Sequence, residues 1–155
     1  MSVMKEMQFP VSVRWPGGRL AHADADGKER LQLATPPEFR GGLAGHWSPE
    51  DLLVAATASC FVLTLAAVAE RCEAPLLDAT VTATGHMSRR DDRRFGFTVI
   101  ELDAVLETVP GGENAVRAAA AAAEERCLIE RALEVPVHVA VEVEAVAPVA
   151  EVTPV

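Results

Sequence analysis

The sequence contains three cysteines that could carry out thiol chemistry: Cys60, Cys72 and Cys127. A cysteine thiolate attacks peroxides and disulfides, whereas a buried thiol is commonly an inert apolar group. Cys60 lies in an apolar stretch, which favours the inert role when it is taken alone. Cys127 follows Glu124-Glu125-Arg126 near the end of a predicted helix. The two thiols form an attacking and resolving pair if the fold brings their Cα atoms within about 7 Å. Cys72, beside charged residues, is expected to be a bystander.

Two charged residues could assist a reactive thiol. A guanidinium near a cysteine lowers the pKa of the thiol and polarises the O–O bond of a peroxide. Arg19 follows the turn Pro16-Gly17-Gly18, which would expose it. A solvated arginine at a strand end is the alternative. Glu50 lies in the first turn of a predicted helix, where a carboxylate is favourable with or without a catalytic task.

The four histidines, by contrast, suggest no site. His22, His46, His86 and His138 show no spacing typical of metal ligands. The sequence also has no phosphate-binding loop and no glycine motif for a dinucleotide. We therefore expect neither a bound metal nor a bound cofactor.

The elements that must position these residues begin with short strands and a long helix. Val11, Val13 and Trp15 share one face, and turn residues follow them, which predicts two or three antiparallel strands in the first forty residues. Ser48-Pro49-Glu50-Asp51 is a strong helix start, with Ser48 as N-cap. The helix should run to about Arg71. Because it is apolar on both sides, we expect it to be central and covered all round.

The second half of the sequence alternates in long runs. It predicts strands over 79–85 and 95–106 joined by a charged turn at 89–94, a helix over 113–126 and a last strand over 135–143. Residues 147–155 are expected to be a flexible tail. The pattern predicts one α+β domain over residues 1–146.

Composition restricts the partners and the compartment. The 155 residues (16.5 kDa) contain 14 Lys and Arg against 23 Asp and Glu, a net charge of −9 with a pI near 4.9. This charge argues against binding to nucleic acid or anionic membranes. The N-terminus shows no apolar leader, and the apolar run 52–69 is rich in Ala, which favours a buried helix over a membrane span. We expect a cytoplasmic protein with reduced thiols.

The run from Ser48 to Phe61, SPEDLLVAATASCF, closely resembles the first-cysteine motif of the OsmC/Ohr family. The order of the predicted elements is also similar over about residues 10–146. The resemblance implies an α+β fold with antiparallel sheets around a long central buried helix. It also implies an intertwined homodimer whose two active sites lie at the subunit interface.

Members of that family are thiol-dependent reductases of organic and fatty-acid hydroperoxides. The resemblance implies that Cys60 is the peroxidatic cysteine and Cys127 the resolving one. It implies that Arg19 activates the thiolate and that Glu50 holds Arg19 by a salt bridge. Reducing equivalents would come from an external dithiol, notably a lipoylated protein.

One segment departs from the family pattern. Better-studied members usually have proline after the second cysteine, where this sequence has Leu128-Ile129-Glu130. We expect the loss of proline to change the local bend, and the charge of Glu130 to disfavour a thiolate. This departure motivates an alternative function: a non-catalytic dimer of the same fold that binds an apolar ligand or senses oxidation.

The spacing of two site residues adds a geometric constraint. Glu50 and Cys60 are ten residues apart, which is about 15 Å along a straight helix. They cannot share one site within an unbroken helix. Either the chain bends, or Arg19 and Glu50 reach Cys60 of a partner subunit.

Overall fold

The computed structural model describes residues 6–147, and its contacts divide the chain into two compact units. The first unit ends at Leu53 and the second begins at Val54. Except for Ala147, the expected tail 147–155 lies outside the described residues. The single domain over 1–146 stays a prediction.

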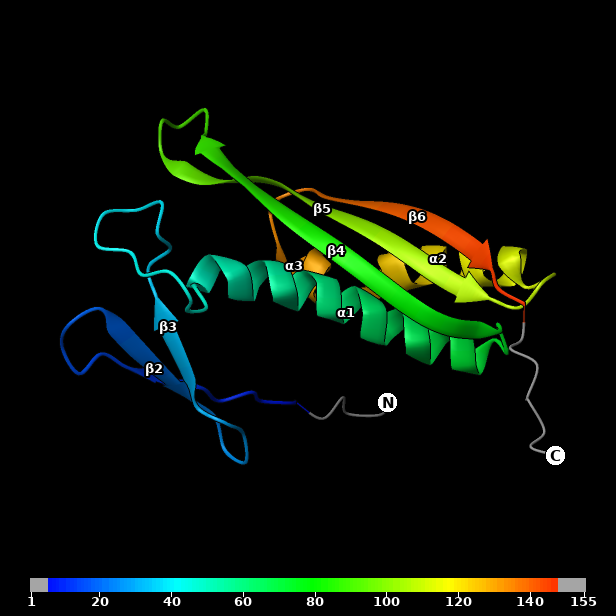
Figure 1. The fold of residues 1–155 in the computed structure, drawn as a ribbon, viewed down its shortest axis with the longest axis horizontal. Coiled ribbons are helices and arrows are strands. Elements are labelled where there is room, and N and C mark those ends of the chain that lie inside the picture. Colours follow the sequence, from blue (N-terminus) through cyan, green and yellow to red (C-terminus); the bar gives the residue numbers. More distant parts are fainter. Residues whose placement is uncertain (1–5, 148–155) are drawn as a thin grey trace, which may run out of the picture. The chain divides into compact units, whose positions relative to one another are not determined.

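The first unit contains a three-stranded antiparallel sheet. Its strands are β1 (Ser12–Arg14), β2 (Leu20–Asp24) and β3 (Leu31–Ala34), in the order β1-β2-β3. Figure 1 labels β2 and β3 of this sheet. Leu33 pairs in addition with Trp47 through an isolated bridge. The antiparallel strands expected in the first forty residues are confirmed.

Helix α1 (Pro49–Arg71) begins where the capping residues predict. The Asp51 N–H donates to Ser48 Oγ at 3.0 Å, and the Ser48 N–H donates to Asp51 Oδ2 at 2.9 Å. This reciprocal pair satisfies backbone donors that a helix N-terminus leaves free. At the other end, Glu73 adopts a left-handed φ of 53°, which is typical of a residue that follows a helix.

The second unit contains the other sheet and two further helices. Strands β4 and β5 form a long hairpin around the charged turn, and β6 lies beside β5. The short helix α3 is not among the predicted elements. The bounds are β4 (Leu76–Arg89), β5 (Phe95–Thr108), α2 (Glu113–Arg126), α3 (Leu128–Ala132) and β6 (Val137–Ala145).

The expectation of purely antiparallel sheets is wrong for the last strand, because β6 runs parallel to β5. Helices α2 and α3 lie between these two strands in the sequence. A parallel neighbour needs a crossover of a dozen or more residues, and these two helices supply it. The mixed α+β fold with two sheets is therefore correct, and the orientation of β6 is the correction.

The core of the second unit lies between the sheet and two helices. Alternate residues of β5 point inward, while Glu101 and Asp103 on the same strand are exposed. Helices α1 and α2 both pack against this inner face (Figure 1). The buried cluster consists of Phe61, Leu65, Val68, Ala69, Ile100, Leu102, Ala104, Leu106, Val116, Ala119, Ala120 and Ala123.

Within one chain, helix α1 is covered on one side, and its expected cover all round stays a prediction that depends on the expected homodimer. Thr57, Phe61 and Leu65 on one side are fully buried, whereas the Leu63 side chain is 69% exposed. By length and composition α1 could cross a bilayer, a property that core helices of soluble proteins share. Its buried side belongs to the core cluster, which explains why the residues on that side are apolar.

Candidate active site

The fold brings Cys60 and Cys127 together. Cys60 lies on α1 and is partly buried. Cys127 is 1% exposed and occupies the junction where α2 ends and α3 begins. The two side chains are in hydrogen-bond contact, and both cysteines are free thiols. The juxtaposition that the sequence left open is therefore present in the second unit.

The surroundings of Cys60 favour its thiolate. Burial alone would raise the pKa of Cys60. The backbone N–H of Ile129, the Cys127 thiol, the backbone N–H of Leu128 and the Thr64 hydroxyl all hydrogen-bond to this sulfur and outweigh burial. The pKa of Cys60 consequently lies below its ordinary value.

Cys127 shifts in the opposite direction. Burial raises the pKa of Cys127, and contact with Cys60 raises it further, whereas the N–H groups of Glu130 and Ile129 lower it by less. The net pKa of Cys127 lies above its ordinary value. Of the two contacting thiols, Cys60 is the one that ionises first, and Cys127 serves as its hydrogen-bond donor.

Three donors to Cys60 were missed by the sequence analysis. Thr64 stands four residues after Cys60 on α1, the helical spacing at which side chains meet, and this signal was available. The N–H groups of Leu128 and Ile129 approach Cys60 only because α3 starts beside it. A backbone donor leaves no trace in the residue type, apart from the absence of proline.

Glu130 contacts Cys127 through its backbone, and the expected effect of its charge on the thiols stays a prediction. Its backbone N–H hydrogen-bonds to Cys127 and lowers the pKa of that thiol. Burial raises the pKa of the Glu130 carboxyl, and the charge of Glu124 raises it further. The backbone of α3 thus brings Glu130 into contact with Cys127.

Arg19 and Glu50 both belong to the first unit. Arg19 is exposed and follows Gly17 and Gly18, whose φ angles are 110° and 76°. The Oε2 oxygen of Glu50 is buried and has no hydrogen-bond partner among the described residues. The structure records no ion pair between Arg19 and Glu50, so their salt bridge stays a prediction. Because α1 is continuous, Glu50 and Cys60 are about 15 Å apart along its axis.

A mostly apolar hollow of about 680 Å³ opens beside Arg19 in the first unit. Its lining includes Trp15, Leu33 and Leu52, and Arg19 is its one charged residue. An apolar surface with a single guanidinium suits an organic molecule with one polar group. It offers little to a small, fully polar molecule.

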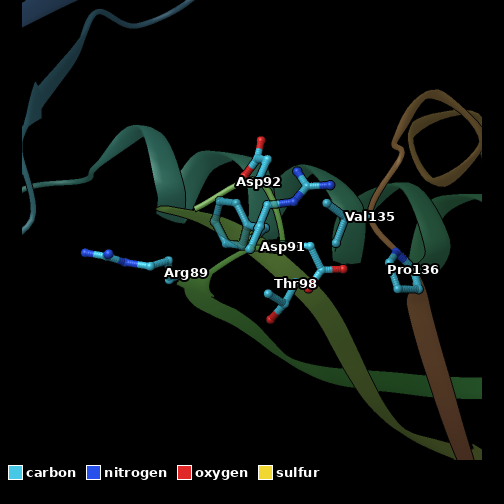
Figure 2. Close-up of a pocket in the computed structure, with 8 residues that line it drawn as sticks. Arg89, Asp91, Asp92, Thr98, Val135 and Pro136 are labelled. Atoms are coloured by element: carbon cyan, nitrogen blue, oxygen red, sulfur yellow. The ribbon is translucent and has the colours of Figure 1, made fainter. Parts of the chain in front are cut away.

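A second hollow, of about 380 Å³, lies at the turn between β4 and β5 (Figure 2). Figure 2 shows Arg89 extending away from Val135 and Pro136, with Asp91 and Asp92 between them. Its charges have both signs, and neither cysteine lines it. Among residues 6–147, no group of three or more His, Cys, Asp or Glu side chains is arranged to hold a metal ion.

Comparison with known proteins points to one family. Residues 42–142 match the family model described as OsmC-like protein. This range includes Cys60, Cys127 and Glu50, and it begins after Arg19. No protein among the curated sequences matches the chain.

Solved structures from several bacteria resemble this one. An OsmC-like protein of unknown function from Vibrio cholerae has a TM-score of 0.81 at 17% identity, covering 88% of this chain and 100% of that one. An organic hydroperoxide resistance protein from Legionella pneumophila has a TM-score of 0.72 at 28% identity (92% and 100%). The organic hydroperoxide resistance protein of Bacillus subtilis has a TM-score of 0.63 at 25% identity (89% and 98%). The fold is thus shared along almost the full length of each.

Proposed function

This chain belongs to the family of OsmC-like proteins, and we propose that it is a thiol-dependent peroxidase that reduces organic hydroperoxides to alcohols. In the cell this activity would serve defence against oxidative stress. Its similarity to two organic hydroperoxide resistance proteins supports the proposal.

The observation that carries the proposal is the contact between two thiols whose pKa values shift in opposite directions. A peroxidase with two cysteines needs one sulfur that is readily ionised and a second that stays protonated until it is used. The lowered pKa of Cys60 and the raised pKa of Cys127 meet this need. Structural packing of two cysteines would not require such a division.

The reaction follows from this division. The Cys60 thiolate attacks the distal peroxide oxygen; a bond from Sγ to oxygen forms, the O–O bond breaks, and the alkoxide takes a proton from water to leave as an alcohol. The sulfur becomes a sulfenic acid as the peroxide is reduced. The Cys127 thiol then attacks this sulfur, releasing water and closing a disulfide. An external dithiol, proposed to be of the lipoyl type, restores both thiols by exchange and is itself oxidised to a disulfide.

Arg19 and Glu50 are proposed to complete the site. A guanidinium would stabilise the Cys60 thiolate and polarise the peroxide, and Glu50 would orient it through paired N–H bonds. The buried, unpartnered Oε2 of Glu50 is an acceptor that such a partner would satisfy. Because about 15 Å of helix separates Glu50 from Cys60, we place Arg19 and Glu50 at the Cys60 of a second subunit in a homodimer.

The substrate class follows from the apolar hollow beside Arg19. Trp15, Leu33 and Leu52 would contact the organic part of a hydroperoxide, and the guanidinium would face its O–O group. Hydrogen peroxide has no apolar part to bury, so we expect it to be a poor substrate. We propose the cytoplasm as its location, because the proposed cycle needs both thiols to return to the reduced state, which a reducing compartment favours.

The test counts thiols after one equivalent of cumene hydroperoxide. Cys72→Ser removes the exposed third cysteine, so that the chain contains only the two site thiols. We expect both to disappear rapidly in this background. Adding Cys60→Ser should abolish the loss, and adding Cys127→Ser should leave a sulfenic acid that dimedone traps.

The alternative, a dimer that binds an apolar ligand or senses oxidation, gives other results. Rapid loss of one thiol in the Cys72→Ser background would mean that Cys60 reacts without resolution, which suits a sensor. No loss over minutes would overturn the peroxidase. The hollow beside Arg19 should then bind a hydrophobic fluorescent probe, and Cys60→Ser should leave that binding unchanged.

A further inference from the structure

The turn that carries Arg19 is closed by a tryptophan side chain. Trp15 Nε1 donates a hydrogen bond of 3.0 Å to the Gly18 carbonyl within the loop between β1 and β2. Gly17 and Gly18 adopt positive φ values, a region that glycine enters and leaves at little cost. Apart from chain neighbours, no described atom lies within 4 Å of where a Cβ on either glycine would stand. The space around the two glycines is therefore open, and the indole hydrogen bond ties the turn from within.

Trp15 also lines the hollow into which Arg19 is presented. Both residues border the same space, together with Leu33 and Leu52. The aromatic ring thus forms part of the wall beside the guanidinium, while its N–H group holds the turn just before Arg19. One side chain contacts both the proposed substrate space and the segment that carries the charge.

We propose that Trp15 is a positioning residue for Arg19, acting through the hydrogen bond from its indole N–H to the Gly18 carbonyl. The inference rests on the proposed function, because Arg19 is the group through which Trp15 acts. A planar guanidinium serves a thiolate and a peroxide only in a narrow range of orientations. A two-glycine turn without its tie samples many orientations, and the reaction loses the advantage of a fixed group.

Trp15→Phe tests this directly, because it keeps an aromatic ring and removes the N–H donor. We expect turnover of cumene hydroperoxide to fall about fivefold, the factor for one neutral hydrogen bond. KM should stay unchanged because the ring still lines the hollow. The pH at which Cys60 is half-alkylated by iodoacetamide should rise, a change that a merely structural role would not cause.

Trp47→Phe is the matched control. Trp47 is likewise an exposed tryptophan of the first unit, but it lines a different hollow and is joined to β3 through its backbone. The same substitution there should leave turnover and the alkylation profile at wild-type values. An equal loss in both variants would overturn the proposal.

A double-mutant cycle separates this inference from the function on which it rests. In an Arg19→Ala background, Trp15→Phe should have no further effect, because the positioned group is gone. Additive effects, or no effect of Trp15→Phe in the wild type, would overturn the role of Trp15 and leave the peroxidase intact. If Arg19→Ala itself leaves turnover unchanged, the proposed role of Arg19 fails.

Discussion

Leu128 shows how a residue can act on a thiolate through its backbone alone. Its side chain is exposed, yet its N–H donates to Cys60 and helps to lower the pKa of that thiol. Family members with proline at the corresponding position lack this donor. The departure that the sequence analysis treated as a weakness therefore supplies an extra hydrogen bond to the proposed attacking sulfur.

Leu128→Pro should raise the pKa of Cys60, because it removes one of the N–H groups that hydrogen-bond to this sulfur and favour its thiolate. Proline is tolerated at the first position of a helix, so α3 should persist. Alkylation at neutral pH should slow, and the profile against pH should move upward.

Leu128→Ala is the control, because it removes the side chain and keeps the N–H. It should alkylate at the wild-type rate across the pH range. If the two variants instead slow equally, the side chain of Leu128 matters and its N–H does not.

At the residue scale, the sequence indicated which cysteines to consider, but it indicated only some of the groups that donate hydrogen bonds to Cys60. The positions of Cys60 and Cys127 made them a candidate pair, and the family resemblance assigned their roles. Thr64 could have been found from its spacing. The N–H of Ile129 could not, because the approach of α3 to α1 depends on packing between segments almost seventy residues apart.

Among the elements, α1 depends on its N-terminal cap. Ser48 is almost fully buried and exchanges hydrogen bonds with Asp51. Ser48→Ala should lower the free energy of unfolding by about 1 kcal/mol and the Tm by about 2–4 °C, as measured by circular dichroism. Ser59→Ala is the control in the same helix: Ser59 Oγ donates only to the Ala56 carbonyl, and its loss should not destabilise.

The ionised carboxylate of Glu130 in the short helix α3 lowers the free energy of unfolding. Burial raises the pKa of Glu130, and the charge of Glu124 raises it further. A carboxyl group whose pKa is higher in the folded state binds its proton more tightly there, so protonation stabilises the folded state. This stabilisation is complete below the pKa of the unfolded chain, about 4.3, and it is lost as the pH rises through the pKa of the folded state. At pH 7 the ionised Glu130 is therefore unfavourable.

Glu130→Gln should raise the free energy of unfolding at pH 7 by less than about 1 kcal/mol, because the group is only partly buried. At pH 3, where Glu130 is protonated in both states, the gain should vanish. Urea unfolding at the two pH values measures this difference. Glu134→Gln, at an exposed position after α3, should give no comparable gain; a similar gain would assign the effect to net charge.

Local signals predicted the elements well, and their arrangement less well. The start of α1, the range of α2 and the hairpin around 89–94 follow from caps, propensity and alternation. The direction of β6 does not, because its valines alternate identically in either orientation. The parallel pairing is decided by the crossover through α2 and α3, a feature of the tertiary fold.

For the molecule as a whole, the exposed side of α1 is the feature that one chain leaves incomplete. Leu63 is 69% exposed on a helix that is apolar on both sides. If the proposed homodimer covers this side, the protein in solution should have twice the 16.5 kDa mass of one chain. Leu63→Glu should shift it toward the monomer, as measured by light scattering.

Thr80→Glu is the control for that shift, because Thr80 is exposed on the polar outer face of β4. It adds the same charge and should leave the mass unchanged. A wild-type protein that is monomeric at micromolar concentration would contradict the homodimer and, with it, a site shared between subunits.

Because Cys60 and Cys127 are in contact, we expect the melting temperature of the protein to depend on its oxidation state. A disulfide here would close the chain from residue 60 to residue 127 into a loop that contains the whole β4–β5 hairpin and α2. Closing a loop of that length in the unfolded chain corresponds to about 4 kcal/mol of stabilisation. The peroxide-treated protein should melt at a clearly higher temperature than the reduced one, and Cys127→Ser should remove the difference.

The same coupling acts in reverse, because linkage between two equilibria is reciprocal. The free energy by which the disulfide stabilises the folded state equals the free energy by which folding stabilises the disulfide against reduction. In the proposed cycle, a dithiol that reduces this disulfide would therefore have to be a stronger reductant than the unfolded chain would require. The long hairpin between the two cysteines in the sequence would thereby contribute to the reducing power that the proposed dithiol needs.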